Sequence, residues 1–374
     1  MSIKIVEVTS KLQLDEYIRL PELLNSKNNI YFGTTTDDAL EFHDAEKNEL
    51  LKKCQTIKYL AYEGSECVGR IMGIIHEPWN EIYNKRIVRF FQLDYSNSIE
   101  VGDALMQAIG SWAIKFDINT VIGPLGFHDL DPQGCLIEGI TKYPVLNAPA
   151  EFTTVPAYIH KPDVDILYDL FSYLIPVPES DPEYLIKIRD RTVARGEFKI
   201  LNIKSRSDLD PWIDAMLVLL EQNDYNKFGY RKMTSDIFNK HFLESYPLFT
   251  FKFFNIVIDS KDRLVAFTLA HPNISESLLK NRKNIGIWRD LKLRSSMKKA
   301  ERLDLFTMTI DKRVRGLGID ALLILNLFET CRMSGIKNID SNVVHEANRL
   351  ARLECIKLQG EHYKMYRVFK KALN

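Results

Sequence analysis

Hydrophobic and polar positions alternate along the chain in short runs that predict strands, and longer helical patterns separate these runs. Two pairs of apolar runs are each joined by a tight polar turn. One pair covers residues 57–75 around Gly64-Ser65, and the other covers residues 250–270 around Ser260-Lys261-Asp262. Both turns consist of residues that favour hairpins. The pattern predicts a mixed α/β fold.

The same order of elements occurs twice. When the sequence is shifted by 217 residues, residues 88–129 lie beside residues 305–346 without a gap. In this alignment Asp94 lies beside Asp311, and Ile122 lies beside Ile339. Each copy reads as an apolar strand, a short loop, a helix of about four turns and a second apolar strand. We therefore expect two domains of one fold.

A proline-rich segment separates the two copies. Pro176, Pro178 and Pro182 lie within it, and such a run continues neither a helix nor a strand. We expect an N-terminal domain over residues 1–180, a linker helix within 181–197 and a C-terminal domain over 198–374. The length of 374 residues suits two domains of this size.

Charge and cysteine content narrow the class of protein. Fifty Lys and Arg balance fifty Asp and Glu. The chain as a whole therefore has no excess positive charge that would attract nucleic acid or a membrane surface. The five cysteines are scattered and none has a CxxC spacing, which disfavours a disulfide framework or a zinc site. The N-terminus lacks a signal-peptide pattern, and no apolar run reaches the roughly 18 residues of a spanning helix. We expect a soluble, cytoplasmic protein without a membrane partner.

The segment DKRVRGLGIDALL, residues 311–323, joins a predicted strand to a predicted helix. A helix start has unpaired backbone N–H groups and a partial positive charge, which together attract anions. Glycines permit close approach of the backbone, and arginine donors suit phosphate oxygens. The segment predicts a phosphate or pyrophosphate site. The alternative is a helix cap with two solvated arginines.

The six residues Arg313 to Gly318 resemble the Arg/Gln-x-x-Gly-x-Gly/Ala motif of the GNAT superfamily of N-acetyltransferases. The doubled pattern resembles a group of tandem GNAT-like bacterial proteins, and the similarity includes residues 68–75, 123–139 and 345–373. The resemblance covers nearly the whole chain. It implies two tandem GNAT-like domains, each a central, mostly antiparallel, twisted sheet flanked by helices. It also implies acetyl-CoA or another acyl-CoA as cofactor.

The resemblance places the cofactor in the C-terminal domain. The residues that it implies in binding lie in the loop, on the preceding strand and at the start of the last helix: Met308, Ile310, Arg313, Val314, Arg315, Gly316, Leu317, Gly318, Ile319 and Asn348. At the aligned position the first half has Ser96 to Val101, which lacks the glycines and arginines and contains Glu100. We expect the first domain to support the second or to contribute to an acceptor pocket.

Charge is unevenly distributed near this loop. From Lys280 to Arg315 the chain has twelve Lys and Arg against four Asp and Glu, a net charge of +8. A basic rim of this kind would suit the phosphates of coenzyme A. The alternative is a solvated helix face over residues 282–299.

Transfer of an acyl group to an amine needs a base, a donor to the oxyanion and an acid. The resemblance implies an oxyanion donor from the strand backbone within Phe306–Ile310. Our candidates for catalysis are His345 and Glu346, just beyond the last core strand, with Asp304 behind them. A capping or surface role is the alternative for each.

The residue expected to act as the acid differs from the one that is usual in the family. Family members often have a tyrosine about seven residues after the position of Asn348, whereas this chain has Cys355 there. Tyr363 and Tyr366 come only later. Cys355 is therefore the third catalytic candidate, and a buried core position is its alternative.

A Gly/Pro-rich loop in the first half also contains polar residues. His128, Asp129 and Asp131 cluster within residues 123–134. Their spacing matches no metal-binding loop or helix, so we expect no metal. An acceptor pocket lined with carboxylates and a turn capped by Asp side chains stay open as interpretations.

The leading hypothesis is an N-acyltransferase that uses acetyl-CoA or another acyl-CoA and acts on a small-molecule or peptide amine. One alternative is a non-catalytic acyl-CoA-binding or interaction protein. Another is a Fem-type aminoacyl transferase, which also pairs two GNAT-like domains and takes its donor from charged tRNA. The zero net charge disfavours a nucleic-acid partner. A homodimer stays open.

Overall fold

The computed structural model describes residues 2–27, 31, 36–96, 98–127, 131–142, 163–223, 234–239, 243, 250–280 and 287–373, with backbone alone for 287–290. The chain divides into two compact units. The first unit contains Met1–Phe171 and Lys364–Asn374, and the second contains Ser172–Asn226 and Lys232–Tyr363. These units are groups of contacting residues, so the domain ranges 1–180 and 198–374 stay a prediction.

The first unit is built around a sheet whose strands are mostly antiparallel. Its order is β1 (Ile3–Glu7), β2 (Gln55–Glu63), β3 (Glu66–Ile75), β4 (Ile87–Tyr95), β5 (Thr120–Gly123), β14 (Glu361–Ala372) and β7 (Asp165–Pro176). Only the β4–β5 pair is described as parallel within this unit. Strand β6 (Cys135–Glu138) pairs with β14. The expected hairpin around Gly64-Ser65 is confirmed, since β2 and β3 are antiparallel neighbours.

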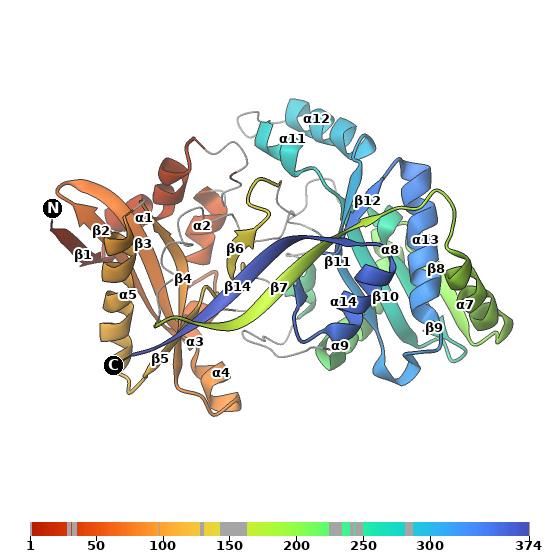
Figure 1. The fold of residues 1–374 in the computed structure, drawn as a ribbon, viewed down its shortest axis with the longest axis horizontal. Helices are drawn as coiled ribbons and strands as arrows, with labels where there is room; N and C mark the ends of the chain where they lie inside the picture. Colours follow the sequence, from red (N-terminus) through yellow and green to blue (C-terminus); the bar gives the residue numbers. More distant parts are fainter. Residues whose placement is uncertain are drawn as a thin grey trace. The chain divides into compact units, whose positions relative to one another are not determined.

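Helices cover both faces of this sheet. They are α1 (Lys11–Leu24), α2 (Thr36–Phe42), α3 (Leu50–Lys53), α4 (Glu77–Ile82) and α5 (Ile99–Ile114). Helix α5 packs on β1 to β4 through an apolar stripe that includes Val101, Leu105 and Ile109 (Figure 1). Helix α1 contributes Tyr17 and Leu20 to the cluster that contains Met72 and Phe91. The alternation along β2 and β3 thus places one apolar set under each layer of helices.

The second unit has a sheet of the same kind. Its order is β7, β12 (Asn338–Asp340), β11 (Arg302–Ile310), β10 (Leu264–Pro272), β9 (Asn255–Asp259) and β8 (Phe198–Asn202). The β11–β12 pair is parallel, and the other described pairs between these strands are antiparallel. Strand β13 (Val344–His345) pairs with β7. The predicted hairpin around Ser260-Lys261-Asp262 is confirmed as the β9–β10 connection.

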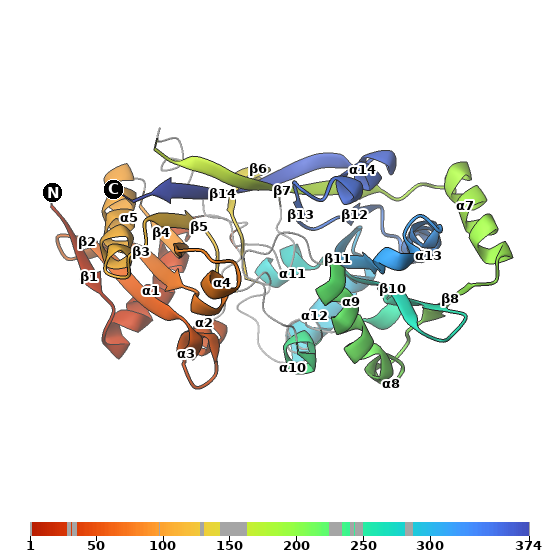
Figure 2. The same cartoon turned by 90° about the horizontal axis from the view of Figure 1, so that it is seen from below.

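The second unit has one long helix that follows β11. Its helices are α7 (Glu183–Ala194), α8 (Arg206–Leu209), α9 (Ile213–Asn223), α10 (Ser235–Phe238), α11 (Ser275–Lys280), α12 (Ile287–Lys298), α13 (Ile319–Ser334) and α14 (Arg349–Lys357), with short 3-10 turns η1 (Asp210–Trp212), η3 (Phe251–Phe253) and η4 (Lys312–Val314). Helices α13 and α9 both contact β10 and β11 and lie on opposite faces of them (Figure 2). Helix α7 lies within the range 181–197 expected for a linker helix, and its role as a linker stays a prediction. No described helix combines the length and apolar character that crossing a bilayer requires.

The repeat of elements is confirmed, because β4–α5–β5 and β11–α13–β12 have the same order and the same parallel pair. The gap-free alignment of their loops is wrong. Three residues, 96–98, separate β4 from α5, whereas eight residues, 311–318, separate β11 from α13. Ile99 to Val101, aligned with part of the second loop, lie in the first turn of α5. The arginine–glycine loop is therefore an extension that the first unit lacks.

Candidate functional site

Strand β11 is paired with β12 only over its first three residues. The paired rows are Arg302–Asn338, Leu303–Ile339 and Asp304–Asp340. Beyond them β11 continues beside β10 to Ile310, whereas the chain after Asp340 stays beside β7, where Ser341 N donates to Tyr173 O over 2.9 Å. We call the two diverging segments, Leu305–Ile310 and Ser341–His345, the strand fork of the second unit. Along the fork the side chains of Leu305 to Met308 are only half-buried.

Strand β11 is irregular beside this fork. Leu305 faces Ala270 and Thr307 faces Leu269, so Phe306 lies at a β-bulge. A bulge bends a strand and re-aims its backbone groups. It falls within Phe306–Ile310, where an oxyanion donor is expected. That role stays a prediction.

The loop after β11 begins with a tightly paired arginine. Asp311, which is 3 % exposed, accepts a hydrogen bond from Arg313 N over 2.9 Å and forms an ion pair with Arg313 Nη2 over 2.5 Å. Hydrogen bonding to Arg313 holds the pKa of the Asp311 carboxyl below its usual value. The charge of Arg313 is thus already partly compensated. Arg315 is half-buried, and its Nε donates to Ile310 O over 3.4 Å.

The two glycines of the loop meet different surroundings. Both have left-handed backbone angles, with φ of 76° at Gly316 and 88° at Gly318. A Cβ on Gly316 would have open space, whereas one on Gly318 would lie 2.8 Å from Ile188 Cγ2 and still closer to Thr192 Oγ1. Thr192 Oγ1 also donates to Leu317 O over 2.9 Å. Close packing of α7 therefore explains Gly318, and Gly316 is the exposed, open position.

Helix α13 begins at this loop without a side-chain cap. Its N-cap residue is Gly318, which has no side chain to accept from the first turn. Backbone N–H groups at such a start can bind an anion. The arrangement fits a phosphate group of a ligand, with the backbone of Gly316 and the side chain of Arg315 beside it.

Several of the expected cofactor residues belong to the apolar core. Met308, Ile310 and Val314 pack against a buried cluster that contains Ile319 and Leu323 of α13. Their half-buried side chains thus help to hold the helix beside the loop. Leu317 is half-buried. Asn348 is the N-cap of α14, and its Oδ1 accepts from Ala351 N over 3.3 Å.

The expected catalytic residues have local structural partners. His345 Nδ1 accepts from Ala347 N over 3.0 Å, and burial lowers the pKa of the ring. Glu346 is half-buried, and its backbone O accepts from Arg352 Nη1 over 3.3 Å. Cys355 is 8 % exposed, and burial raises the pKa of its thiol to about 11. The structure brings these three residues to the turn and first helix after the fork, and their catalytic roles stay predictions.

The structure also places a row of polar side chains across the second sheet. Cα pairing aligns His271 of β10 with Asp304 of β11, and Asp304 with Asp340 of β12. All three are 0 % exposed. Tyr363 of β14 donates its hydroxyl to Asp340 Oδ2. We call His271, Asp304, Asp340 and Tyr363 the buried polar row. The carboxylate of Asp304 inside the apolar run LDLF, residues 303–306, was its sequence signal.

The corresponding strands of the first unit do not diverge in the same way. β4 and β5 pair from Ile87–Thr120 to Arg89–Ile122. Leu125 N then donates to Phe90 O over 2.9 Å, so the chain after β5 stays beside β4. Arg89, which is 1 % exposed, donates from Nη1 to Gly126 O over 2.9 Å and to Phe127 O over 3.1 Å. The first-unit fork is closed by its own backbone.

The start of α5 also differs from the start of α13. Ser98 is its N-cap, and the Ser98 hydroxyl donates to Glu100 Oε2 over 2.6 Å. A carboxylate in the first turn already interacts favourably with the helix dipole. It would repel a phosphate at that position. The start of α5 thus has a carboxylate where the start of α13 has an uncapped glycine.

The Gly/Pro-rich loop of the first unit is described only in part. His128 and Asp129 lie outside the described residues. Asp131 Oδ2 accepts from Phe127 N over 2.7 Å, as in a turn capped by an Asp side chain. Among the described residues no three His, Cys, Asp or Glu side chains are grouped so as to hold a metal ion.

The basic run of the second half extends through α11 and α12, but residues 281–286 lie outside the described part. Lys280 Nζ pairs with Glu276 within α11 over 2.5 Å. The structure therefore does not decide between a basic rim and a solvated helix face.

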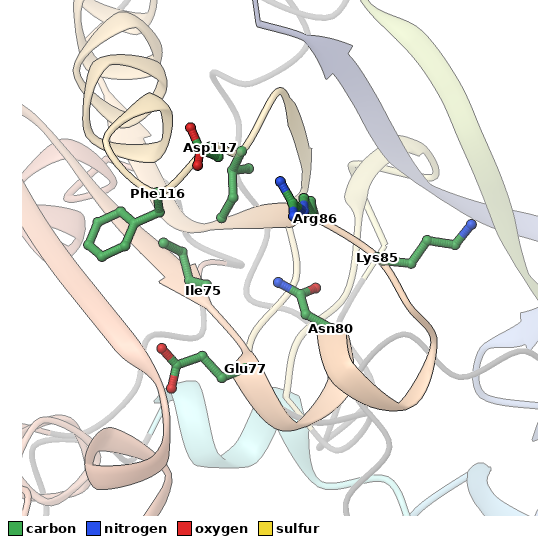
Figure 3. A pocket seen from close by; sticks show the side chains of 8 residues that line it. Ile75, Glu77, Asn80, Lys85, Arg86, Phe116 and Asp117 are labelled. Carbon is green, nitrogen blue, oxygen red and sulfur yellow. The ribbon is translucent and has the colours of Figure 1, made fainter.

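A polar pocket lies in the first unit, where β4 and β5 begin (Figure 3). Its volume is about 310 Å³, and its lining residues are Ile75, Glu77, Asn80, Lys85, Arg86, Phe116, Asp117 and Ile118. Two cations and two carboxylates balance in it. Because β4 and β5 are parallel, this pocket is at the opposite end of the pair from the fork, and we assign it no catalytic role.

Comparisons of sequence found no protein family and no curated protein that match the chain. Solved structures do match it. A tandem GNAT protein from the clavulanic acid biosynthesis pathway, solved without acetyl-CoA, is 11% identical with a TM-score of 0.54, over 100% of this chain and 99% of that one. A glucosamine N-acetyltransferase region of a fungal multi-domain β-N-acetylglucosaminidase is 12% identical with a TM-score of 0.52, over 99% of this chain and 38% of that protein. The chain has the tandem GNAT fold.

Proposed function

We propose that the chain is an N-acyltransferase that binds acetyl-CoA or another acyl-CoA at the strand fork of the second unit. The observation that carries the proposal is the combination of a diverging parallel pair, β11 and β12, with an uncapped helix start at the end of the same strand. The first unit combines a closed fork with an acidic helix start. The fold supports acyl transfer as the reaction class.

The residues of the second unit would divide the binding between them. The backbone of Gly316 and the first turn of α13 would accept the pyrophosphate, and Arg315 would add charge. Because Asp311 already pairs with Arg313, we expect Arg313 to contribute less. The β11 edge from Leu305 to Ile310 is not paired with β12, and its backbone could bind the amide groups of the pantetheine arm. When bound, acyl-CoA supplies an activated thioester.

The test is binding of coenzyme A by calorimetry and by thermal unfolding. A ligand at about 100 times its dissociation constant stabilises a protein by about 2.7 kcal/mol, which raises the unfolding midpoint by several degrees. Arg315→Glu should weaken binding about 10- to 100-fold, because it replaces a charged donor to phosphate with a carboxylate. Lys261→Glu is the matched control, since it makes the same charge change at an exposed turn of the same unit.

Equal affinity in Arg315→Glu and Lys261→Glu would contradict the proposed location. No midpoint shift with millimolar coenzyme A or acetyl-CoA would contradict the proposed cofactor. Binding without transfer to any amine would instead identify a non-catalytic acyl-CoA-binding protein. A steep salt dependence of RNA binding would favour the Fem-type alternative.

A further inference from the structure

The buried polar row lies where the strands of the second fork separate. Asp304 and Asp340 form the last paired row of β11 and β12, and neither side chain has any exposed surface. Placing two carboxylates side by side in an apolar sheet costs stability unless each is hydrogen-bonded. The two carboxylates lie at the closed end of the proposed donor site. This position suggests that they have a chemical role that offsets their cost in stability.

The two carboxylates have different partners. Asp304 forms an ion pair with Arg302 Nε over 3.3 Å and accepts from Asn273 Nδ2 over 2.6 Å. Asp340 accepts from Asn342 N over 2.8 Å and from the Tyr363 hydroxyl, which are both neutral donors. The charge of Asp304 is therefore compensated by a cation, whereas that of Asp340 is stabilised by hydrogen bonds. Asp340 is the carboxylate that accepts from a hydroxyl group, so a proton can reach it along a hydrogen bond.

Tyr363 connects Asp340 with the surface. Its side chain is half-buried, unlike the three fully buried members of the row. Burial and the Asp340 carboxylate raise the pKa of Tyr363, so the phenol keeps its proton at neutral pH. A phenol that donates its proton to a carboxylate can still accept a hydrogen bond on its oxygen. An amine at the fork could therefore pass its proton to Tyr363 while Tyr363 passes its own to Asp340.

We propose that Tyr363 and Asp340 form a two-residue proton relay that deprotonates the acceptor amine, an inference that rests on the proposed acyl transfer. An acceptor that arrives as an ammonium first loses one proton to the Tyr363 oxygen, while the Tyr363 hydroxyl proton moves to Asp340. The neutral amine nitrogen then bonds to the acyl carbon, the carbon–sulfur bond of the acyl-CoA breaks, and the second N–H proton goes to the leaving thiolate. Asp340 afterwards returns its proton to solvent through Tyr363. The products are an amide and a thiol, and both side chains are restored.

This assignment differs from the candidates that the sequence offered. His345 Nδ1 already accepts from Ala347 N, and the lowered pKa of the ring makes it a weak base. Cys355 is buried with a raised thiol pKa. The relay instead uses Asp340 of β12 and Tyr363 of β14, which are 23 positions apart in the sequence.

The experiment compares Tyr363→Phe and Asp340→Asn with the unchanged protein. Release of coenzyme A from acetyl-CoA is measured with water alone and with a fixed panel of ethylamine, ethanolamine, glucosamine, lysine and a lysine-containing tetrapeptide. Loss of a general base typically costs about 10²- to 10⁴-fold in rate. Asp340→Asn can still accept from Tyr363 but cannot take up a proton. Tyr62→Phe is the control, since Tyr62 donates to Glu16 Oε2 over 2.5 Å in the first unit.

We expect both relay variants to lose at least about 100-fold in kcat while their midpoint shift with coenzyme A is kept. The loss should shrink as the pH approaches the pKa of the amine, because solution then supplies the deprotonated acceptor. A merely structural role would not give this pH dependence.

Rates equal to those of Tyr62→Phe in both variants would overturn the relay. The relay would also be overturned if the unchanged protein bound coenzyme A but showed neither transfer nor hydrolysis. That result would not contradict the proposed donor site. A protein that shows no coenzyme A shift at all would contradict the proposed function itself. If Tyr363→Phe unfolds, Asp340→Asn alone decides.

Discussion

The third paired row of the parallel strands differs between the two units. In the first unit it contains Arg89, whose neighbours across the strands are Ile74 and Ile122. In the second unit it contains Asp304, whose neighbours are His271 and Asp340. Arg89 donates to the carbonyls of the returning chain and holds it beside β4, whereas the acidic row has no such role and the chain diverges. The same fold thus contains a closed fork whose last paired row includes Arg89 and an open fork whose last paired row includes Asp304 and Asp340.

This difference shows how two domains with the same order of elements can differ at the end of their parallel strands. Strand β4 is buried along almost its whole length, whereas β11 is half-buried next to the fork. The loop before the following helix is also shorter in the first unit. Closing the fork buries more of the strand, which stabilises the first unit by apolar burial.

Removal of the Arg89 side chain should have the largest effect on stability. Arg89→Ala leaves two buried carbonyls without a donor and creates a cavity, which we expect to cost about 3 to 4 kcal/mol in the free energy of unfolding. Arg86→Ala, at an exposed position before β4, is the control. Coenzyme A affinity should not change. A cost below about 1 kcal/mol in denaturant unfolding would contradict the role of Arg89 in closing the fork.

Acid should weaken the first unit through His43. Burial lowers the pKa of this ring to about 3 in the folded protein, from 6.5. Below about pH 6.5 the unfolded chain takes up a proton that the folded chain does not, so stability falls as the pH decreases. The expected loss at pH 4.5 is about 2 to 3 kcal/mol relative to pH 7. His43→Phe should abolish it, and His362→Phe, at an exposed histidine, is the control. If stability depended on pH equally in both variants, His43 would not be the cause of the acid sensitivity.

The two loop glycines should differ in their response to alanine. Gly318→Ala places a methyl group against Ile188 and Thr192 at a left-handed backbone position, and we expect a loss of about 2 to 4 kcal/mol. Gly316→Ala meets open space, so only backbone strain of about 1 kcal/mol remains. A double-mutant cycle with Thr192→Ala should show coupling for Gly318 and none for Gly316. Equal losses of stability in the two alanine variants would mean that packing against α7 is not the reason for a glycine at position 318.

The smallest effect is expected at Arg313. This side chain is 67% exposed, so solvent screens its pair with the buried Asp311. The backbone N of residue 313 also donates to Asp311, and this hydrogen bond does not depend on the side chain. Arg313→Gln should leave the unfolding midpoint within experimental error and weaken coenzyme A by less than about threefold. A larger loss than that of Arg315→Glu would reverse the order of importance that the structure gives these two arginines.

Local patterns made much of the fold predictable. The hairpins at Gly64-Ser65 and Ser260-Lys261-Asp262, the helix after the second loop and the order of repeated elements all follow from short-range alternation and turn residues. The loop itself was identified from six consecutive residues. The gap-free alignment was wrong because sequence similarity in the flanking strands does not report the number of residues between them.

Contacts between distant residues could not be predicted. Gly318 is explained by Thr192 of α7, and the Thr192–Leu317 hydrogen bond joins residues 125 positions apart. Arg89 looked like one more strand residue until its carbonyl partners were known. Asp340 and Tyr363 lie in strands that contain other polar residues, so nothing in the sequence identifies them as partners. The functional roles of all the expected site residues, those of the loop included, stay predictions.

Hydrogen exchange with and without coenzyme A tests the central difference between the units most directly. The account predicts slower exchange of backbone amides at residues 305–320, along β11 and the start of α13, and no change at residues 90–101, along β4 and the start of α5. Protection at residues 90–101, or at neither segment while coenzyme A binds, would contradict the assignment of the donor site to the second unit.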